Sequence, residues 1–328
     1  MPPVAPVSST VDPEICITCE PIPMRIIALF GPTGVGKTAV AIALAERLRA
    51  RGEDPVAVSA DALQVYAGLE TLTGAAGAVE QALLEHRLLS FLPLDASFSA
   101  GEYAELAHAQ IDELLAQRRR PIVVGGTGLY LRAALTDLDL RPSPPAAVRE
   151  RWMEELRTRG APALYATLLE RAPWVAESET IGPSDSHRIV RALELHELGE
   201  LEPPEGPSQL WSLDVRHPTV LAGLTMEREA LYAAIDERVE RMVASGAREE
   251  VLRARAAGAS QTARKALGFE ELLQGDVERM KRRTRNYARR QLTWMRKLAG
   301  VRQIDVTGRD PAAVAGEILD CAARDDAI

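Results

Sequence analysis

The residues with the clearest chemical potential form a glycine-rich loop, Gly-Pro-Thr-Gly-Val-Gly-Lys-Thr, at positions 31–38. A short apolar run precedes it at 26–30, and a helical pattern follows from residue 39. Strand, loop and helix in this order are the context of a phosphate-binding P-loop. The glycines let successive backbone N–H groups point inward, and the helix N-terminus adds partial positive charge. The loop therefore predicts a site for a di- or triphosphate group.

Every position of this loop is a candidate phosphate ligand, through either its backbone or its side chain. Lys37 supplies a full positive charge, and the Thr38 hydroxyl is a candidate ligand for Mg²⁺, which we expect as the cofactor. The expected diphosphate-binding residues are Gly31, Pro32, Thr33, Gly34, Val35, Gly36, Lys37 and Thr38.

A second group of reactive side chains lies at residues 59–66. Asp61, Gln64 and Tyr66 place a carboxylate, an amide and a phenol in one short segment. A carboxylate can accept a proton from an incoming amine, and an amide has the donor and acceptor pair that reads the edge of an adenine. The alternative is that Asp61 serves only as a metal ligand or as a helix cap.

A third group is basic. Residues 279–297 contain nine Lys or Arg residues and no acid, with Tyr287 and Trp294 spaced i, i+7 among them. A positive helix with interleaved aromatic residues suits a nucleic-acid backbone and its bases. The alternative is a solvated face whose two aromatic residues are turned to the core.

An alternation of strands and helices must position these groups. From Met24 onward the pattern predicts an α/β fold, a P-loop NTPase-like parallel sheet with helices on both faces. Strands are expected at 55–59 and 121–124, with a helix at 103–117 between them. Because ligands gather at the carboxyl ends of such strands, the P-loop, Asp61 and Thr127 should converge on one site.

Proline-rich breaks divide the chain. Residues 1–23 lack a signal-peptide pattern, so they are expected to be a disordered tail or to precede a true start at Met24. Residues 24–140 and 211–328 form the expected core, and 141–210 a helical insertion domain. The insertion should contain helices at 146–158, 161–171 and 185–198. Beyond it, strands are expected at 220–224 and 301–306, and helices at 227–245, 247–256 and 276–298.

Composition sets wider limits. The 328 residues are 46% hydrophobic and 26% charged, as in an ordinary globular protein, and the net charge of −8 argues against indiscriminate nucleic-acid binding. Three cysteines, of which Cys16 and Cys19 form one isolated CxxC, fit a reducing cytoplasm better than a disulfide framework or a metal site. No apolar stretch approaches the ~18 residues of a membrane span. We expect a cytoplasmic monomer that does not bind membranes.

The residues alone leave several functions open. A small-molecule P-loop kinase would use Asp61 on Mg²⁺ and the helical insertion as a lid. An RNA-binding NTPase, or an RNA-binding module without catalysis, would use the basic segment without group transfer. A kinase predicts ATP turnover without RNA.

Taken together, the motifs resemble the tRNA dimethylallyltransferase family over most of the chain. The order and spacing of GGTGLY, RALE and the TR…RQ.TW segment are far more specific than a P-loop alone. The matching segments are Gly31–Thr38, Ser59–Tyr66, Pro121–Tyr130, Asp185–Glu194, Leu231–Met242, Leu267–Glu270 and Thr284–Trp294.

The resemblance implies a prenyl transfer. The P-loop would bind dimethylallyl diphosphate. The other substrate would be a tRNA anticodon stem-loop, in which N6 of the adenosine 3′ to the anticodon would attack the allylic carbon of the diphosphate ester. The implied catalytic residues are Asp61 as general base, Thr33 at the diphosphate and Arg238 at the leaving group. The implied tRNA-binding residues are Asp61, Ala62, Leu63, Gln64, Thr127, Arg149, His187, Arg188, Arg191, Arg264, Lys265, Gly268 and Phe269.

Simpler roles remain for several of these residues. Arg238 could pair with acidic neighbours on its own helix, such as Asp236, and Arg188 and Arg191 could lie on a solvated face. Thr127 could serve only a turn.

The sequence also departs from the family pattern. The family lysine is missing from residues 73–77, and Ala62, Ser90 and Ala234 replace its usual serine, aspartate and arginine.

Overall fold

The structure, a computed structural model, describes residues 24–141, 143–178, 181–203 and 209–325. The expectation for residues 1–23 lies outside the described residues. The centre of the fold is a parallel sheet with the strand order β3-β2-β4-β1-β5-β6. Its strands are β1 (Ile26–Phe30), β2 (Pro55–Ser59), β3 (His86–Arg87), β4 (Arg120–Gly125), β5 (Thr219–Thr225) and β6 (Arg302–Asp305). The predicted fold class is confirmed.

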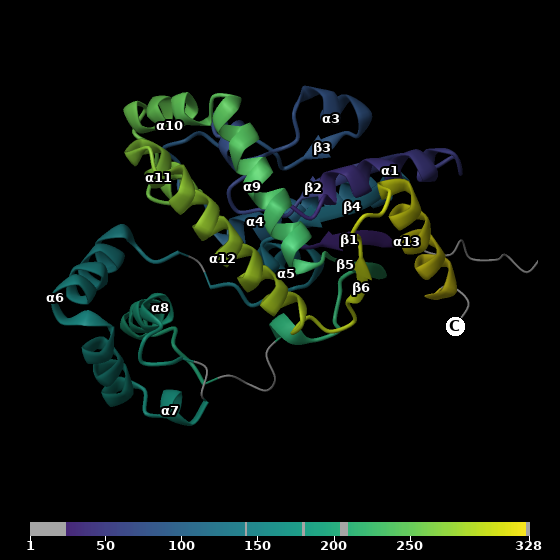
Figure 1. Cartoon of the computed structure of the whole chain (residues 1–328). Helices are drawn as coiled ribbons and strands as arrows, with labels where there is room; N and C mark the ends of the chain where they lie inside the picture. The colour runs from purple at the N-terminus through teal and green to yellow at the C-terminus, as the bar shows by residue number, and fades with distance from the viewer. Residues whose placement is uncertain (1–23, 142, 179–180, 204–208, 326–328) are drawn as a thin grey trace, which may run out of the picture.

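Helices cover both faces of this sheet (Figure 1). Those outside the insertion are α1 (Lys37–Arg49), α2 (Glu70–Thr73), α3 (Ala78–Leu83), α4 (Ala100–Ala116), α5 (Gly128–Leu135), α9 (Arg228–Ala244), α10 (Ala247–Ala256), α11 (Phe269–Gln274), α12 (Val277–Met295) and α13 (Pro311–Asp325). Two single turns of 3₁₀-helix, η1 (Gln209–Trp211) and η2 (Ala263–Lys265), complete this part.

The strands are apolar throughout because both of their faces are buried. Every residue of β1 is buried, and its side chains alternate between two core clusters. Ile27 and Leu29 pack with α1 and α13, whereas Ile26, Ala28 and Phe30 pack with α4 and α5. A strand of such uniform composition can therefore take a central place in the sheet.

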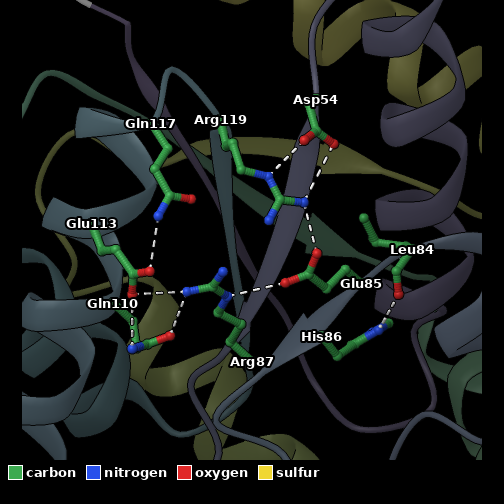
Figure 2. Close-up of polar contacts among 9 residues, drawn as sticks. All are labelled: Asp54, Leu84, Glu85, His86, Arg87, Gln110, Glu113, Gln117 and Arg119. Carbon is green, nitrogen blue, oxygen red and sulfur yellow. Dashed lines mark hydrogen bonds and ion pairs between the residues drawn. The ribbon is translucent and has the colours of Figure 1, made fainter.

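The edge strand β3 is short, and charged side chains hold it in register (Figure 2). Arg119, after α4, contacts Asp54 at 2.6 Å and Glu85 at 2.7 Å. Arg87 contacts Glu85 at 3.1 Å and Glu113 of α4 at 3.0 Å. Partly exposed pairs are each weak, but this network joins the starts of β2 and β3 to α4. The network therefore holds β3, the strand that follows residues 59–66 in the chain, against β2.

The region 141–210 contains α6 (Ala146–Arg171), α7 (Trp174–Ser178) and α8 (Ser186–Glu197). Backbone angles of φ 77° and ψ 163° at Gly160 break α6 into the two helices that the sequence predicts. These helices share their own apolar cluster, which includes Trp152, Leu168 and Leu193. Figure 1 shows them set apart from the sheet. We propose that they fold as a separate domain.

Most predicted elements agree with the structure to within a few residues. The helix expected from residue 103 begins at Ala100, because Ser99 and Glu102 form a capping box. The helix at 247–256 is confirmed with the expected bounds. The sequence did not predict the two-residue strand β3, the long helix α13, or the short helices α2, α3, α5, α7 and α11.

The proposed separate domain can be tested with a cavity in its core. Leu168→Ala removes a fully buried side chain, which typically costs about 2–5 kcal/mol. Hydrogen exchange should become faster in α6 and α8, while β1 and β4 keep their protection. The matched Leu44→Ala variant in α1 should instead make hydrogen exchange faster in β1 and β4. Equal loss of protection in both regions after Leu168→Ala would contradict the separate domain.

Candidate active site

Strand register brings distant residues to one edge of the sheet. Phe30 of β1 pairs with Gly125 of β4, and Ser59 of β2 pairs with Val124. The segments that follow these strands, with Gly31, Asp61 and Thr127, therefore leave the sheet side by side. A Cβ atom at Gly125 would lie 2.2 Å from the Ala60 carbonyl oxygen, so only glycine permits this close approach.

The P-loop adopts a conformation that depends on its glycines. Gly34 and Gly36 have φ angles of 86° and 91°, which place them in the left-handed region. Lys37 Nζ donates to the carbonyl oxygens of Gly31 at 2.9 Å and Pro32 at 3.1 Å. The side chain of Lys37, the first residue of α1, thus lies across the start of its own loop.

Lys37 lies in an environment that disfavours its charge. Burial is the main cause that lowers the pKa of Lys37 to about 8; Asp61 opposes this shift, and Arg238 contributes to it. Burial also lowers the pKa of Arg238, against the attraction of Asp61. Two cations that share a poorly solvated region create a site in which an anion is favoured.

Arg238 reaches this region from α9. Its Nη2 donates to the carbonyl oxygens of Thr73 at 3.2 Å and Gly74 at 3.3 Å. Gln64 Nε2 donates to the same two oxygens, at 3.4 and 3.3 Å. The alternative of a salt bridge to Asp236 does not hold, because that carboxylate pairs with Arg285 of α12 at 2.6 Å.

Arg238 retains donor capacity at this position. Its Nε atom is buried without a hydrogen-bond partner among the described residues. A Cβ atom at Gly74 would lie 1.9 Å from Arg238 Nη2, and Gly74 has a φ of 59°. The turn that lacks the family lysine therefore positions the arginine through its backbone.

Asp61 directly follows β2 and is partly buried. Its Oδ1 accepts a hydrogen bond from the Leu63 backbone N–H at 3.0 Å. Residues 62–65 form bends and turns, so Asp61 does not cap a helix. Among the described residues no donor occupies the second carboxylate oxygen, which leaves it available to accept a proton.

Helix α12 closes the other side of the site. Tyr287 lies within 3.4 Å of Thr127, hydroxyl to hydroxyl, and burial raises the pKa of Tyr287 to about 12. Trp294 packs on Trp211 with 4.6 Å between ring centroids. Both aromatic residues are thus turned inward, as in the alternative interpretation of the basic segment, and do not form a surface for RNA bases.

The cations of α12 fall into two sets. Acidic residues pair with the first set, Arg279, Lys281, Arg283 and Arg285. The second set is exposed, and no described carboxylate forms an ion pair with it; we call it the basic face of α12 and define it as Arg282, Arg289, Arg290, Arg296 and Lys297. The basic face therefore keeps its charge for an anionic partner.

Predicted tRNA-binding residues of the insertion gather around a buried carboxylate. Arg149 and Arg191 each lie 3.4 Å from Glu194, which is 0% exposed. Arg188 pairs with Asp185 at 3.4 Å on an exposed surface. Burial lowers the pKa of His187, and so do nearby Lys265 and Arg149. Cations of the insertion and of the core, Arg149 and Lys265, therefore act on the same imidazole.

The remaining predicted tRNA-binding residues differ in accessibility. Arg264 is exposed, pairs with Glu270 at 2.7 Å and stacks over Phe269 at 5.8 Å. The Phe269 ring is fully buried. Gly268 has a φ of 98°, and a Cβ atom there would lie 2.5 Å from the Met280 side chain. Ala62 and Leu63 are partly buried against two different clusters. Contacts of these residues with tRNA stay predictions.

The residues near Thr38 fit a magnesium ion that is held largely by a substrate. Thr38, Ser59 and Gln64 line one small pocket, together with His86 and apolar side chains. The oxygen atoms of the first three suit Mg²⁺, which commonly keeps several waters and binds substrate phosphates. The described residues contain no group of three or more His, Cys, Asp or Glu side chains that could bind a metal alone.

Sequence reasoning missed Gln291 of α12. This side chain is 4% exposed, and its amide contacts both the P-loop and the segment after β4. A sequence signal existed, because Gln291 lies four residues after Tyr287 and three before Trp294, on one helix face. A buried glutamine on such a face calls for hydrogen-bond partners.

Known proteins are similar to this chain over most of its length. A profile of the family described as IPP transferase matches residues 64–298. A tRNA dimethylallyltransferase of Kineococcus radiotolerans is 37% identical over 308 residues, covering 90% of this chain and 95% of its own. The chain belongs to the tRNA dimethylallyltransferase family. A relative from an Anaeromyxobacter species is 40% identical over 291 residues, covering 85% of this chain and 94% of its own.

Solved structures agree with this family. A full-length tRNA isopentenylpyrophosphate transferase from Bacillus halodurans has a TM-score of 0.65 at 31% identity, covering 92% of this chain and 96% of its own. A eukaryotic dimethylallyltransferase acting on tRNA has a TM-score of 0.67 at 23% identity, which supports the fold alone. In the described part of this chain, every helix is too short or too polar to cross a membrane.

The lowered pKa of Lys37 gives a test of the anion site. Above about pH 8 the lysine loses its proton and its attraction for an anion. The advantage of the wild-type chain over Lys37→Met in binding inorganic pyrophosphate should therefore fall by up to about tenfold per pH unit. Calorimetric titrations of both proteins between about pH 7 and pH 9 measure this ratio, from which the ionisation of pyrophosphate itself cancels. A constant ratio would show that Lys37 does not contact the anion.

Proposed function

We propose that this chain transfers the dimethylallyl group from dimethylallyl diphosphate to N6 of the adenosine 3′ to a tRNA anticodon. A bond forms between N6 and the allylic carbon, the bond from that carbon to the diphosphate oxygen breaks, and diphosphate leaves. Membership of the family supports the reaction. The observation that carries it is the placement of one carboxylate, Asp61, near two partly buried cations, Lys37 and Arg238.

The cations would bind the leaving group. Backbone N–H groups of the P-loop at the start of α1 would bind the diphosphate together with Lys37. Arg238, with a buried Nε still to donate, would stabilise the charge that develops on departure. Thr33 would contact the same group from the first part of the loop. Mg²⁺, bound through Thr38 and the diphosphate, would spread this charge further.

Asp61 would act on the nucleophile. Its free carboxylate oxygen can accept the proton that N6 loses as the new bond forms. The adenine must leave the stacked anticodon loop to reach this position. Gln64 follows Asp61 by three residues and donates to the two carbonyl oxygens that also bind Arg238, those of residues 73 and 74. Its amide would therefore lie close to the bound adenine.

The RNA itself would contact charged surfaces around the site. The basic face of α12 offers cations without acidic partners among the described residues, and such cations suit phosphate groups. Two further cations, Arg149 of the insertion and Lys265 of the core, both act on His187 and would add to this surface. These surfaces account for RNA binding by a chain with a net charge of −8. A cytoplasmic location is part of the same proposal.

A small-molecule kinase is less well supported. The family is one of prenyltransferases, and the basic face of α12 has no role in a reaction between two small molecules. A kinase would release ADP from ATP in the absence of RNA.

Replacement of the proposed base tests the reaction. Asp61→Asn keeps an oxygen for the Leu63 N–H but removes the proton acceptor. Transfer of labelled dimethylallyl groups to tRNA should fall by about 10²- to 10⁴-fold, the usual contribution of a general base. RNA binding should change little, because the size and turn of the segment are preserved.

The control is Asp95→Asn, which changes an exposed carboxylate to the same amide. It should transfer the label at the wild-type rate. If Asp61→Asn also does so, another group accepts the proton. If the wild-type chain transfers no label to any tRNA, the proposed function itself is wrong.

A further inference from the structure

Gln291 joins two loops that belong to different strands. Its Oε1 accepts a hydrogen bond from the Thr33 backbone N–H at 2.9 Å, and its Nε2 donates to the Gly126 carbonyl oxygen at 2.7 Å. Thr33 belongs to the P-loop after β1, and Gly126 follows β4. Both capacities of one buried amide are therefore used to connect the two segments.

The surrounding contacts leave little freedom. A Cβ atom at Gly126 would lie 2.3 Å from Gln291 Nε2 and 3.3 Å from Lys37 Nζ. One turn further along α12, a Cβ atom at Gly128 would lie 2.1 Å from the Trp294 ring. The segment after β4 can lie this close to α12 only because it lacks side chains at these positions.

The same helix has a second face. Tyr287, Gln291 and Trp294 share the inner face, whereas Arg282, Arg289 and Arg296 repeat every seven residues on the exposed side. One rigid element thus separates the loops of the site from a basic surface. Lys37 Nζ, on the inner side, bonds to Gly31 and Pro32, immediately before Thr33.

We propose that Gln291 is a positioning residue that fixes the P-loop relative to the Gly126–Thr127 segment. It acts through Thr33 and Gly126 and does not touch the reacting atoms. The diphosphate on one loop and the adenosine beside the other would then keep the spacing that the transfer requires. The role assigned to the two loops rests on the proposed function.

Two variants separate the two hydrogen bonds. Gln291→Met has a similar length and makes neither bond. Gln291→Glu can still accept from the Thr33 N–H, but as a carboxylate it opposes the Gly126 oxygen. When protonated, it regains a donor and resembles glutamine. The ionisable groups of this region include Lys37, Asp61 and Tyr287, together with Asp236 and Arg238 of α9, which packs against α12.

The expected results follow from lost positioning. At saturating substrates, kcat of Gln291→Met should fall by about a hundredfold, as for a misplacement of about 1 Å. Its Kd for inorganic pyrophosphate should rise by about fivefold, because the loop is less well ordered before binding. The ratio of kcat between Gln291→Glu and wild type should increase as the pH falls, and that of Gln291→Met should not.

Val251→Ala is the control for a general loss of stability. Val251 is fully buried in α10, away from both loops, and its truncation should leave kcat and the pyrophosphate Kd within about twofold of wild type. Wild-type kcat in Gln291→Met, or a pH-independent ratio for Gln291→Glu, overturns the positioning role while the proposed function stands. If wild type transfers nothing to tRNA, the pyrophosphate Kd decides alone: an unchanged value in Gln291→Met overturns the inference.

Discussion

Parallel pairing of β2, β4 and β1 is the constraint on which the site depends. In this register each strand ends at the same edge, so the P-loop, Asp61 and Thr127 must lie next to one another. The pairing is tight: Gly125 has no room for a side chain beside Ala60. The sheet therefore sets the spacing of the reactive groups, and the helices adjust around it.

The charges at this edge explain why an anion belongs there. Lys37 and Arg238 are poorly solvated and disfavour each other, and Asp61 compensates only in part. Desolvation of both cations is costly without a partner, so a bound diphosphate would offset a penalty that the empty site carries. The same arrangement places the carboxylate next to the leaving group, where a nucleophile must lose its proton.

Much of this could be predicted from the sequence. The apolar strands and the P-loop are local signals, and a short loop between a buried strand and a helix has few possible conformations. The helix at 247–256 and the break at Gly160 followed equally from local pattern. The position of Asp61 followed from the rule that parallel strands end at one edge.

Other features depend on packing between distant segments, which local pattern does not encode. Local pattern left an ion pair on its own helix open as the alternative for Arg238. Packing excludes Asp236 as the partner, because Arg285 from α12 pairs with it, and backbone oxygens of residues 73 and 74 bind Arg238. The inward direction of Tyr287 and Trp294 depends on residues 127 and 128, which lie far earlier in the chain. Gln291 can form both of its hydrogen bonds only because β1 and β4 are paired, which brings Thr33 and Gly126 together. The two-residue strand β3 is too short to show a period.

The proposed reaction requires the Asp61 carboxylate and a diphosphate on the P-loop to lie on opposite sides of the bound adenine. A crystal structure of the chain with an anticodon stem-loop RNA and a non-hydrolysable thio analogue of dimethylallyl diphosphate tests it most directly. We expect the adenine N6 within about 2.6–3.2 Å of the Asp61 carboxylate, with the allylic carbon on its other side and the diphosphate on the P-loop. An adenine bound elsewhere, or an Asp61 side chain turned away from the base and the diphosphate, would contradict it.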